Sequence, residues 1–497
     1  MAYKGVLFRV WQCGLDAIRF LVWIRVLGAT IYTSTSDSLL VISILIATTV
    51  ALGIWFPSVG VFALLVFTPL LNGLSVTGLL HYKDALSTAW AAFLASSLLI
   101  AYTRRYQVTS LNKLAKTPTL LRSTLIGADL IASLVAFSLV ILLWTNRSSA
   151  EIFVALTCTV HTYSDQNYYL TSAFVWLCGL QILPLLSSAL SNIPQKETRR
   201  VQYLTLRWFI PVIIVATIIV FTLVQGFLSL PASHEFHPAG TGFSPFEDNH
   251  SLGSISVALL GLLLMKPYST RLGRYLWALC VIYLLAVIAN SWSRATWFAA
   301  AVVVFAAIAV NLSRKWIYIS GLLAVIFVIS FNLYSQRDQW WNNPYVGKII
   351  KLVRIEKLSE KSPGRFSMYQ RALIMIKERP LTGHGIGSFY TKSAKYSPAN
   401  DPQKDRPEFA HNFLLQFTAE LGIPAALILV ALFIVPLFAG FTHASKISCI
   451  AIALPLIGYL VTQLTANSFN IYLTNQVFFW WLFAILILEL ANPNTEV

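Results

Sequence analysis

A succession of long apolar segments constrains this chain more than any other feature. Each runs for about 20 residues, the length that a helix needs to cross the hydrocarbon core of a bilayer. Hydrophobic residues make up 57% of the 497 residues and charged residues only 11%, whereas soluble domains carry about 25% charged residues. The chain is therefore predicted to be an all-α, polytopic membrane helical bundle of about 12–14 transmembrane helices. The expected spans are 38–55, 58–80, 85–103, 119–144, 170–191, 205–230, 251–266, 274–291, 295–313, 316–334, 422–441, 447–466 and 474–491.

The distribution of apolar and charged residues divides the chain into four regions. Residues 1–37 are basic and amphipathic, and they fit either a helix lying in the membrane interface or a first span. Residues 38–334 are expected to form a transmembrane bundle, residues 335–410 one large, partly helical loop, and residues 411–497 the C-terminal transmembrane helices.

Lysine and arginine residues in the short connections predict the orientation of the bundle. If the spans alternate from residue 85 onward, the basic connections fall on one side of the membrane, which the positive-inside rule makes cytoplasmic. The loop 335–410 then lies on the outer side, as does the tight turn near 291–294. The basic connections lie near residues 104–122, 196–200, 266–274, 314–315 and 446.

The outer loop is itself basic, in a chain with a formal net charge of +16. Long loops cross the membrane regardless of their charge, so this excess does not contradict the orientation. A basic outer surface favours an anionic partner such as a phosphate-bearing lipid headgroup. The alternative is that these cations only solvate the loop and contact the membrane surface. A nucleic-acid partner is not expected.

The second half of the loop carries a dense pattern of special residues. Arg365 precedes a segment with helical periodicity, 367–377, which contains Arg371 and which Pro380 stops. Gly383, Gly385 and Gly387 then permit a tight turn with close backbone approach. Because no strand precedes these glycines, the pattern does not predict a nucleotide site. The dipeptide His411-Asn412 follows and opens an amphipathic helix that ends at Glu420-Leu421-Gly422.

Several charged or ionisable residues near the membrane have two interpretations each. Arg294 closes a tight outer turn, where it either reaches the interface or points into a cavity that binds substrate. His411 either caps its helix or takes part in catalysis, and Asn412 either caps or orients that helix start. Asp129 lies within a span and needs a partner. A cluster of histidines and acids in 234–250 matches no compact metal-ligand spacing, so no metal site is expected.

The motifs from Arg365 to Gly422 resemble those of the O-antigen ligase and polymerase superfamily of bacterial envelope glycan enzymes. The family pattern "Pro-Leu-x-Gly-x-Gly-x-Gly-x-Phe" is similar to 380–389, and "His-Asn-x-x-Leu-x-x-x-x-Glu-x-Gly" is similar to 411–422. The turn 291–297 resembles the family's "Ser-x-Ser-Arg-x-x-Trp". The segment 241–253 resembles its loop before a span. These motifs together cover about residues 230–445, and their order and spacing make the match specific.

This resemblance implies a membrane glycosyltransferase that needs neither a metal nor a cofactor. Its donor would be a glycan linked to undecaprenyl diphosphate, and its acceptor a hydroxyl group of lipid A–core oligosaccharide or of another glycan. By motif position the essential residues of the ligase branch fall on Arg294, Arg365 and His411. Arg294 and Arg365 would hold the diphosphate with Arg371, Asn412, Gly383 and Gly385, in the bacterial inner membrane with the active site facing the periplasm.

The chemistry of such a transfer agrees with these residue types. Arginine stabilises the charge that develops on a leaving diphosphate, and histidine is the usual base that takes a proton from an attacking hydroxyl near neutral pH. Inversion at the anomeric carbon is the simpler expectation. Arg371 precedes Gly383 by twelve positions, a spacing that differs from the paired Arg-x10-Gly loops of some polymerases and weakly favours the ligase branch.

Three alternatives remain open from the sequence. A polymerase would join lipid-linked repeat units, and a protein O-oligosaccharyltransferase would use a protein hydroxyl. A transporter of lipid-linked glycan is the rival of a different class. It predicts internally repeated halves and discontinuous helices near the midplane, for which the sequence shows no sign.

Overall fold

The computed structural model describes the greater part of the chain, and all of its regular elements there are helices. The described residues form fourteen α-helices and one 3₁₀ helix, without a strand among them, which confirms the all-α prediction. The residues that the structure describes are 2–33, 36–55, 60, 63–65, 67–68, 71, 85–103, 119–145, 168–191, 249–265, 271–291, 293–311, 363–398, 408–442, 447–464, 468–471 and 473–491.

The helices follow the apolar segments of the sequence closely. In the first half of the chain they are α1 (Ala2–Thr33), α2 (Ser36–Trp55), α4 (Ala85–Thr103), α6 (Thr119–Thr145) and α8 (Tyr168–Ser191). The middle part contributes α11 (Asn249–Met265), α12 (Arg271–Asn290) and α13 (Arg294–Asn311). The predicted spans 205–230 and 316–334 lie outside the described residues, and 58–80 is described only in part.

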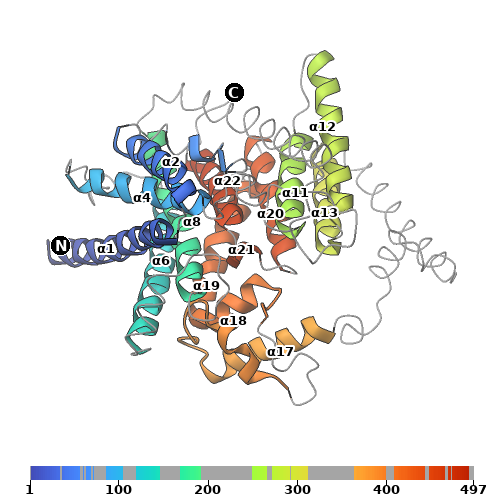
Figure 1. Ribbon diagram of the computed structural model, residues 1–497. Coiled ribbons are helices and arrows are strands. Elements are labelled where there is room, and N and C mark those ends of the chain that lie inside the picture. Colours follow the sequence, from blue (N-terminus) through green and yellow to red (C-terminus); the bar gives the residue numbers. More distant parts are fainter. Residues whose placement is uncertain are drawn as a thin grey trace.

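The last third of the chain contains the elements that matter most for function. They are α17 (Pro363–Glu378), α18 (Ser388–Lys392), the 3₁₀ helix η3 (Ser393–Tyr396), α19 (Phe413–Thr442), α20 (Ile447–Gln463), α21 (Ser468–Ile471) and α22 (Leu473–Ala491). Figure 1 shows α22 in the middle of the molecule, α1, α2 and α4 to one side of it, and α11, α12 and α13 to the other. The short helices α17 and α18 lie at one end, next to the start of α19.

Two described helices are long and apolar enough to cross a membrane by themselves. These stretches are Thr119–Leu142 of α6, with 24 residues, and Phe413–Gly440 of α19, with 28. The other apolar helices have shorter described stretches, so the number of spans stays a prediction. Such long apolar stretches, in a chain whose described elements are all helices, are those of a membrane protein.

The core is rich in aromatic residues where α8, α19, α20, α21 and α22 meet. Trp176 of α8 packs on Phe417 of α19 with ring centroids 4.8 Å apart, and Phe433 of α19 packs on Phe479 of α22 at 4.9 Å. The side-chain amide of Asn470 on α21 donates a hydrogen bond of 3.1 Å to the carbonyl oxygen of Phe413. This contact, together with the rings, holds the first turn of α19 against the bundle.

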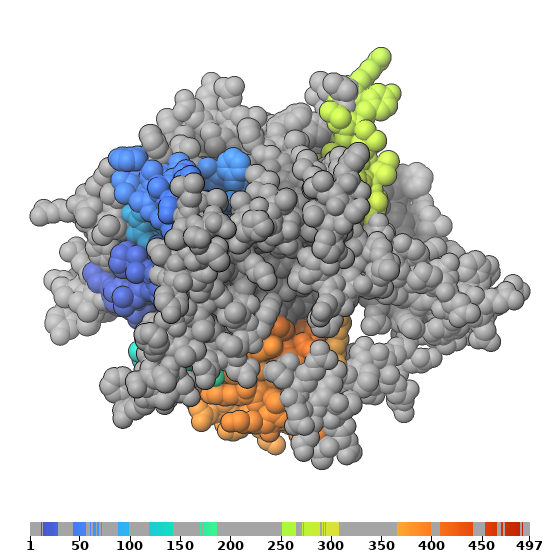
Figure 2. Space-filling model, in the orientation of Figure 1, coloured from blue at the N-terminus to red at the C-terminus, as the bar shows by residue number. Residues whose placement is uncertain are grey.

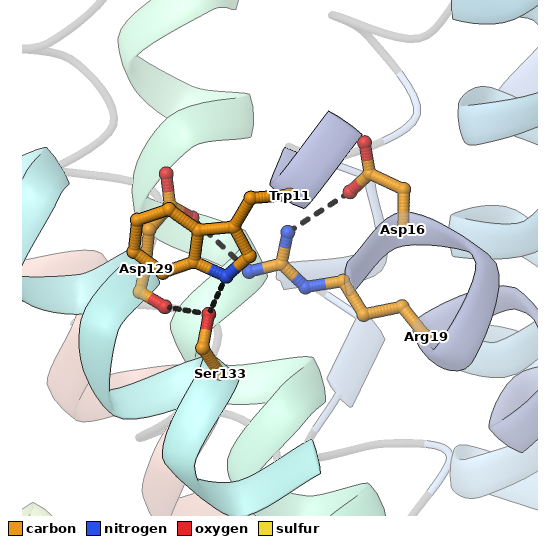
Figure 3. A network of polar contacts seen from close by, with 5 residues as sticks. All are labelled: Trp11, Asp16, Arg19, Asp129 and Ser133. Carbon is orange, nitrogen blue, oxygen red and sulfur yellow. Dashed lines mark hydrogen bonds and ion pairs between the residues drawn. The ribbon is translucent and has the colours of Figure 1, made fainter. Parts of the chain in front are cut away.

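A group of polar side chains connects α1 to α6, and it provides the partner that Asp129 was expected to need. The guanidinium of Arg19 donates hydrogen bonds to Asp16 at 3.0 Å and to Asp129 at 3.3 Å. Beside it, the indole N–H of Trp11 donates to the hydroxyl of Ser133 at 3.1 Å (Figure 3). Arg19 is only 3% exposed, so this arginine and its two carboxylates form a largely buried ion-pair network.

Candidate active site

Helix α17 carries two of the predicted arginines on different sides. It begins at Pro363, where a helix tolerates proline because the missing N–H would have no partner. Arg365 lies in the first turn, and its side chain is partly buried. Arg371 lies on the inner face with Met368, Ala372 and Met375, and its side chain is fully buried. The two arginines therefore have different environments, although the sequence suggested one shared role.

The glycine-rich turn after α17 lies across the first turns of α19. His384 N–H donates to the carbonyl oxygen of Ala419 at 3.1 Å, and Gly385 N–H donates to that of Glu420 at 2.8 Å. Gly383 has φ +63°, and a Cβ atom there would lie 2.3 Å from the carbonyl oxygen of Glu420. Because only glycine fits such a backbone crossing, Gly383 has a packing role. The substrate-binding role expected for Gly383 and Gly385 stays a prediction.

The helix kink at Gly422 belongs to the same crossing. Gly422 has φ +85° and ψ 168° in the middle of α19, so it separates the turns 413–421 from the longer apolar part 423–442. Ile423 N–H, freed from its helical partner by the kink, donates to the carbonyl oxygen of Pro380 at 2.7 Å. The two family motifs therefore fold against each other, backbone to backbone.

Glu420 fastens α18 to this crossing. Its buried carboxylate accepts hydrogen bonds from the N–H of Gly387 at 2.8 Å and of Phe389 at 3.4 Å, and from the side-chain amide of Gln416 at 3.0 Å. A carboxylate at the start of a helix satisfies N–H groups that have no partner inside the helix. We therefore assign Glu420 a structural role.

His411 lies directly before α19 in an unusual backbone conformation. It has φ +50°, the left-handed region that residues other than glycine seldom adopt. Its Nε2 atom lies 3.7 Å from a carboxylate oxygen of Glu408, and the two side chains are 30% and 26% exposed. A strained residue that presents a partly open, carboxylate-paired imidazole is typical of functional positions.

Asn412 acts as the N-cap of α19. Its side-chain oxygen accepts a hydrogen bond of 3.0 Å from the N–H of Leu415, three residues later. This is the capping that the sequence suggested for Asn412. Just before it, Ala410 N–H donates to the side-chain oxygen of Gln416, and the ring of Phe409 packs on that of Tyr390. The segment around His411 is therefore held on both sides.

Arg294 occupies the first position of α13, after a tight turn that polar side chains stabilise. The hydroxyl of Ser291 donates to the carbonyl oxygen of Ile288 at 2.7 Å, and the hydroxyl of Ser293 accepts from Thr296 N–H at 3.4 Å. The indole of Trp297 also donates to Ile288, at 2.9 Å. The side chain of Arg294 lies outside the described residues, so its approach to Arg365 or His411 stays a prediction.

The second histidine of the loop, His384, has a different environment from His411. It is only 6% exposed, and its Nε2 atom lies 3.0 Å from the carbonyl oxygen of Met375. A carbonyl partner requires the hydrogen on Nε2. Burial lowers the pKa of His384, which favours its neutral form. His384 is thus a packing residue between α17 and the glycine-rich turn.

Burial also shifts the pKa values of two further groups in this loop. It lowers the pKa of Lys392, and nearby Arg379 and Lys395 act in the same direction. It raises the pKa of Tyr396 to about 12, helped by a hydrogen bond with Glu378. Three cations thus share a small surface next to His384. Among the described residues, no three or more His, Cys, Asp or Glu side chains lie close enough together to hold a metal ion.

These elements bring the predicted residues of the loop to one end of the molecule. Ala372 and Met375 of α17 form one apolar cluster with Phe389 of α18, with Ala419 of α19 and with Ala410 just before that helix. The turn is further held by hydrogen bonds from Ile386 to Ser138 of α6 and between Thr391 and Tyr169 of α8. The helix that carries Arg365 and Arg371 is therefore in direct contact with the helix that His411 precedes.

Sequence reasoning missed two features of this arrangement. Glu408 was not among the residues nominated for the site, whereas the structure makes it the neighbour of His411. Its spacing of three residues from His411 was the available signal. The contacts of the turn with Ser138 and Tyr169 join parts of the chain that are more than 200 residues apart, and no local pattern indicates them.

A comparison with protein-family models finds the family described as O-antigen ligase, matched over residues 278–430. The matched segment contains every residue that the sequence nominated for the site, from Arg294 to Asn412. A search of curated proteins finds no match.

Proposed function

From the match of residues 278–430 to the O-antigen ligase family, we propose that the chain moves a glycan from undecaprenyl diphosphate to a hydroxyl group of lipid A–core oligosaccharide. The reaction takes place at the periplasmic face of the bacterial inner membrane. The family implies a glycosyltransferase-type enzyme, and the apolar helices make it a membrane protein. The donor, the acceptor and the location are parts of our proposal.

One observation carries the proposal beyond family membership. His411, held in a left-handed conformation and paired with Glu408, precedes the helix on which the arginine-bearing helix α17 packs. A base and a cationic helix in contact at one end of a membrane bundle suit a reaction between a lipid-linked diphosphate and a hydroxyl group. An ordinary capping histidine needs neither the strain nor the carboxylate.

In the proposed reaction, His411 accepts the proton of the acceptor hydroxyl as its oxygen attacks the anomeric carbon. The bond between that carbon and the diphosphate oxygen breaks, undecaprenyl diphosphate leaves, and the configuration at the anomeric carbon inverts. Glu408 stabilises the imidazolium that His411 becomes, as a carboxylate beside histidine does in other enzymes. The leaving diphosphate gains charge that Arg365 and Arg294 stabilise through their planar, permanently charged groups.

The remaining predicted residues support these three. Arg371, buried on the inner face of α17, contributes positive charge next to the site without being exposed to solvent. Asn412 caps α19 and fixes where His411 lies. Gly383 and Gly385 let the turn approach α19 closely, which brings α17 to its place.

The test is a transfer assay with the purified chain in nanodiscs. The donor is undecaprenyl-diphosphate-linked O-antigen, and three acceptors are offered separately: lipid A–core, a second lipid-linked glycan and a hydroxyl-bearing peptide. We expect transfer to lipid A–core. Transfer to the lipid-linked glycan alone would identify a polymerase instead, and transfer to the peptide alone a protein oligosaccharyltransferase. Movement of intact donor between leaflets without any transfer would favour the transporter.

A further inference from the structure

Helix α17 has a second face that the proposed reaction does not use, and this face is apolar and exposed. Phe366, Leu373 and Ile374 are 41%, 55% and 43% exposed. With about 100° of rotation per residue, they lie within a sector of about 100° around the helix, together with Lys377. The opposite side, with Met368 and Arg371, is buried against the protein. The helix is thus covered by protein on one side and open on the other.

The end of α17 is fixed at the place where α19 begins its long apolar stretch. The carbonyl oxygen of Pro380 accepts a hydrogen bond from the N–H of Ile423. Leu381 lies so close to Gly422 that a Cβ on that glycine would be 2.4 Å from the Leu381 carbonyl oxygen. Leu381 is 71% exposed, and its neighbour Ile423 is 40% exposed. The open side of the loop therefore continues into the surface of the span.

That surface of α19 is the side expected to face lipid. Leu427, Ile434 and Phe438 are all more than half exposed, and together with Ile423 they lie close to one line along the helix. A large apolar surface on a 28-residue apolar helix is the normal contact surface for acyl chains. Leu381 extends this lipid-facing surface toward α17. Figure 2 shows that 363–398 and the start of α19 reach the outer surface of the molecule along its lower edge.

Charge complements this arrangement. Lys377 and Arg379 are exposed at the C-terminal end of α17, beside Leu373 and Leu381. Long cationic side chains at such a place keep their apolar stems in the lipid boundary while the charged ends meet phosphate groups. An apolar sector with cations at one end is a feature of helices that lie in the plane of a membrane interface.

We propose that α17 is an interfacial helix, whose Phe366, Leu373 and Ile374 enter the boundary between headgroups and acyl chains of an anionic phospholipid surface. The lipid bilayer itself is the partner of this face. One consequence rests on the proposed function: Arg365, one residue before Phe366, then lies at the depth of the headgroups. A lipid-linked diphosphate would reach it without leaving the membrane.

The proposal is tested by the depth of spin labels in nanodiscs that contain phosphatidylglycerol. In a chain whose five native cysteines are replaced, Leu373→Cys and Ile374→Cys are labelled one at a time. The matched control for Leu373 is Glu378→Cys, which is exposed on the same helix about 140° around from Leu373, whereas Ile374, about 40° from Glu378, marks the edge of the apolar sector. We expect the ratio of collisions with oxygen to collisions with a water-soluble nickel complex to be about threefold or more higher at Leu373 than at Glu378.

Two results would overturn the proposal. Equal access of the nickel complex to both positions means that the apolar face lies in water. Low access of both probes at Leu373 means that protein covers it, either a partner or another copy of the chain. If the cysteine-free chain does not fold, a photoreactive benzoylphenylalanine placed at Leu373 in the native background decides instead. It must crosslink to phospholipid, whereas the same group at Glu378 must not. Neither experiment requires turnover. A negative result would therefore refute the interfacial location of α17 without bearing on the proposed transfer reaction.

Discussion

Charged side chains are buried and neutralised in the network between α1 and α6, whereas they are partly exposed at the site between α17 and α19. Arg19 is 3% exposed, and two carboxylates from two helices neutralise it. At the other site the imidazole of His411 lies beside the carboxylate of Glu408, and both side chains remain partly open. Both regions hold charge in a membrane protein, yet the first is closed and the second is accessible.

The difference teaches where to look for chemistry in such a chain. A buried charge whose partners lie within the protein serves the fold, because removing one partner leaves the other uncompensated. At the α17–α19 site, residues other than His411 stabilise the local structure. Asn412 caps the helix, and Glu420 holds α18. His411 therefore does not have to hold the fold, and the comparison predicts that substitutions in the two regions have different consequences.

Apart from His411 itself, the largest effect is expected for Arg365. Arg365→Ala removes a cation that stabilises the leaving diphosphate, so the rate of transfer should fall by about 10²–10³-fold. Arg365→Lys keeps the charge but loses the planar donor fork, so it should recover only part of that rate. Steady-state transfer assays measure both, and thermal unfolding should be unchanged. A lysine variant with full activity would show that charge alone suffices at this position.

Arg19→Met should affect stability instead of chemistry. It leaves Asp16 and Asp129 without their cation, and breaking such a network costs about 3 kcal/mol, less the part that solvent around the half-open Asp129 recovers. We expect a lower unfolding temperature in detergent and an unchanged rate per folded molecule. Adding Asp16→Leu and Asp129→Leu to Arg19→Met should restore much of the stability. If the single variant instead folds normally and fails to transfer glycan, the closed network has a function of its own.

Glu408→Gln should produce a smaller effect on the rate. Two unit charges 3.7 Å apart interact by about 1 kcal/mol in water-like surroundings, so kcat should fall by about five- to tenfold. KM for the donor should stay the same, because Glu408 acts through His411 and not on the diphosphate. Glu408→Asp should retain more activity than Glu408→Gln. A change in KM alone would mean that Glu408 contacts the substrate.

The smallest effect concerns pH and His384. Burial lowers the pKa of this histidine in the folded state below its ordinary value of 6.5. The folded state therefore binds its proton less readily than the unfolded state does, and acidification favours unfolding. The stabilisation is complete above pH 6.5 and is lost as the pH falls through the lower folded value. His384→Gln, which keeps a donor for Met375, should unfold with less dependence on pH between 5 and 7. An equal dependence in both proteins would assign it to other groups.

Much of the fold was predictable because apolar length is a local signal. The segments 85–103, 119–144 and 170–191 became α4, α6 and α8 with boundaries that agree within a few residues. Asp129 was recognised as needing a partner, but Arg19 lies 110 residues away. Hydropathy measures how well a segment fits lipid, and it carries no information about which helices meet.

For the site, the sequence predicted which residues belong to it but not how they are arranged. Its residues were nominated from family-like motifs, and all of them fall within the matched segment. The way in which the motifs fold together was not predictable. A tight turn with close backbone approach was expected at Gly383, and the structure shows such an approach, whereas Gly422 was expected only as a helix end and is also a place where two backbones cross. Such a role depends on the partner backbone, which the local sequence does not specify.

The measurement that tests the central claim most directly is a single-turnover transfer experiment with His411→Ala at saturating donor, alongside donor binding to the same variant. We expect donor affinity and thermal stability close to those of the unmodified chain, and transfer slower by about 10²–10⁴-fold, because only the transition state loses its base. A variant that binds donor poorly but transfers it at the normal rate once saturated would contradict the account. His411 would then be a binding residue, and the base would have to be another group.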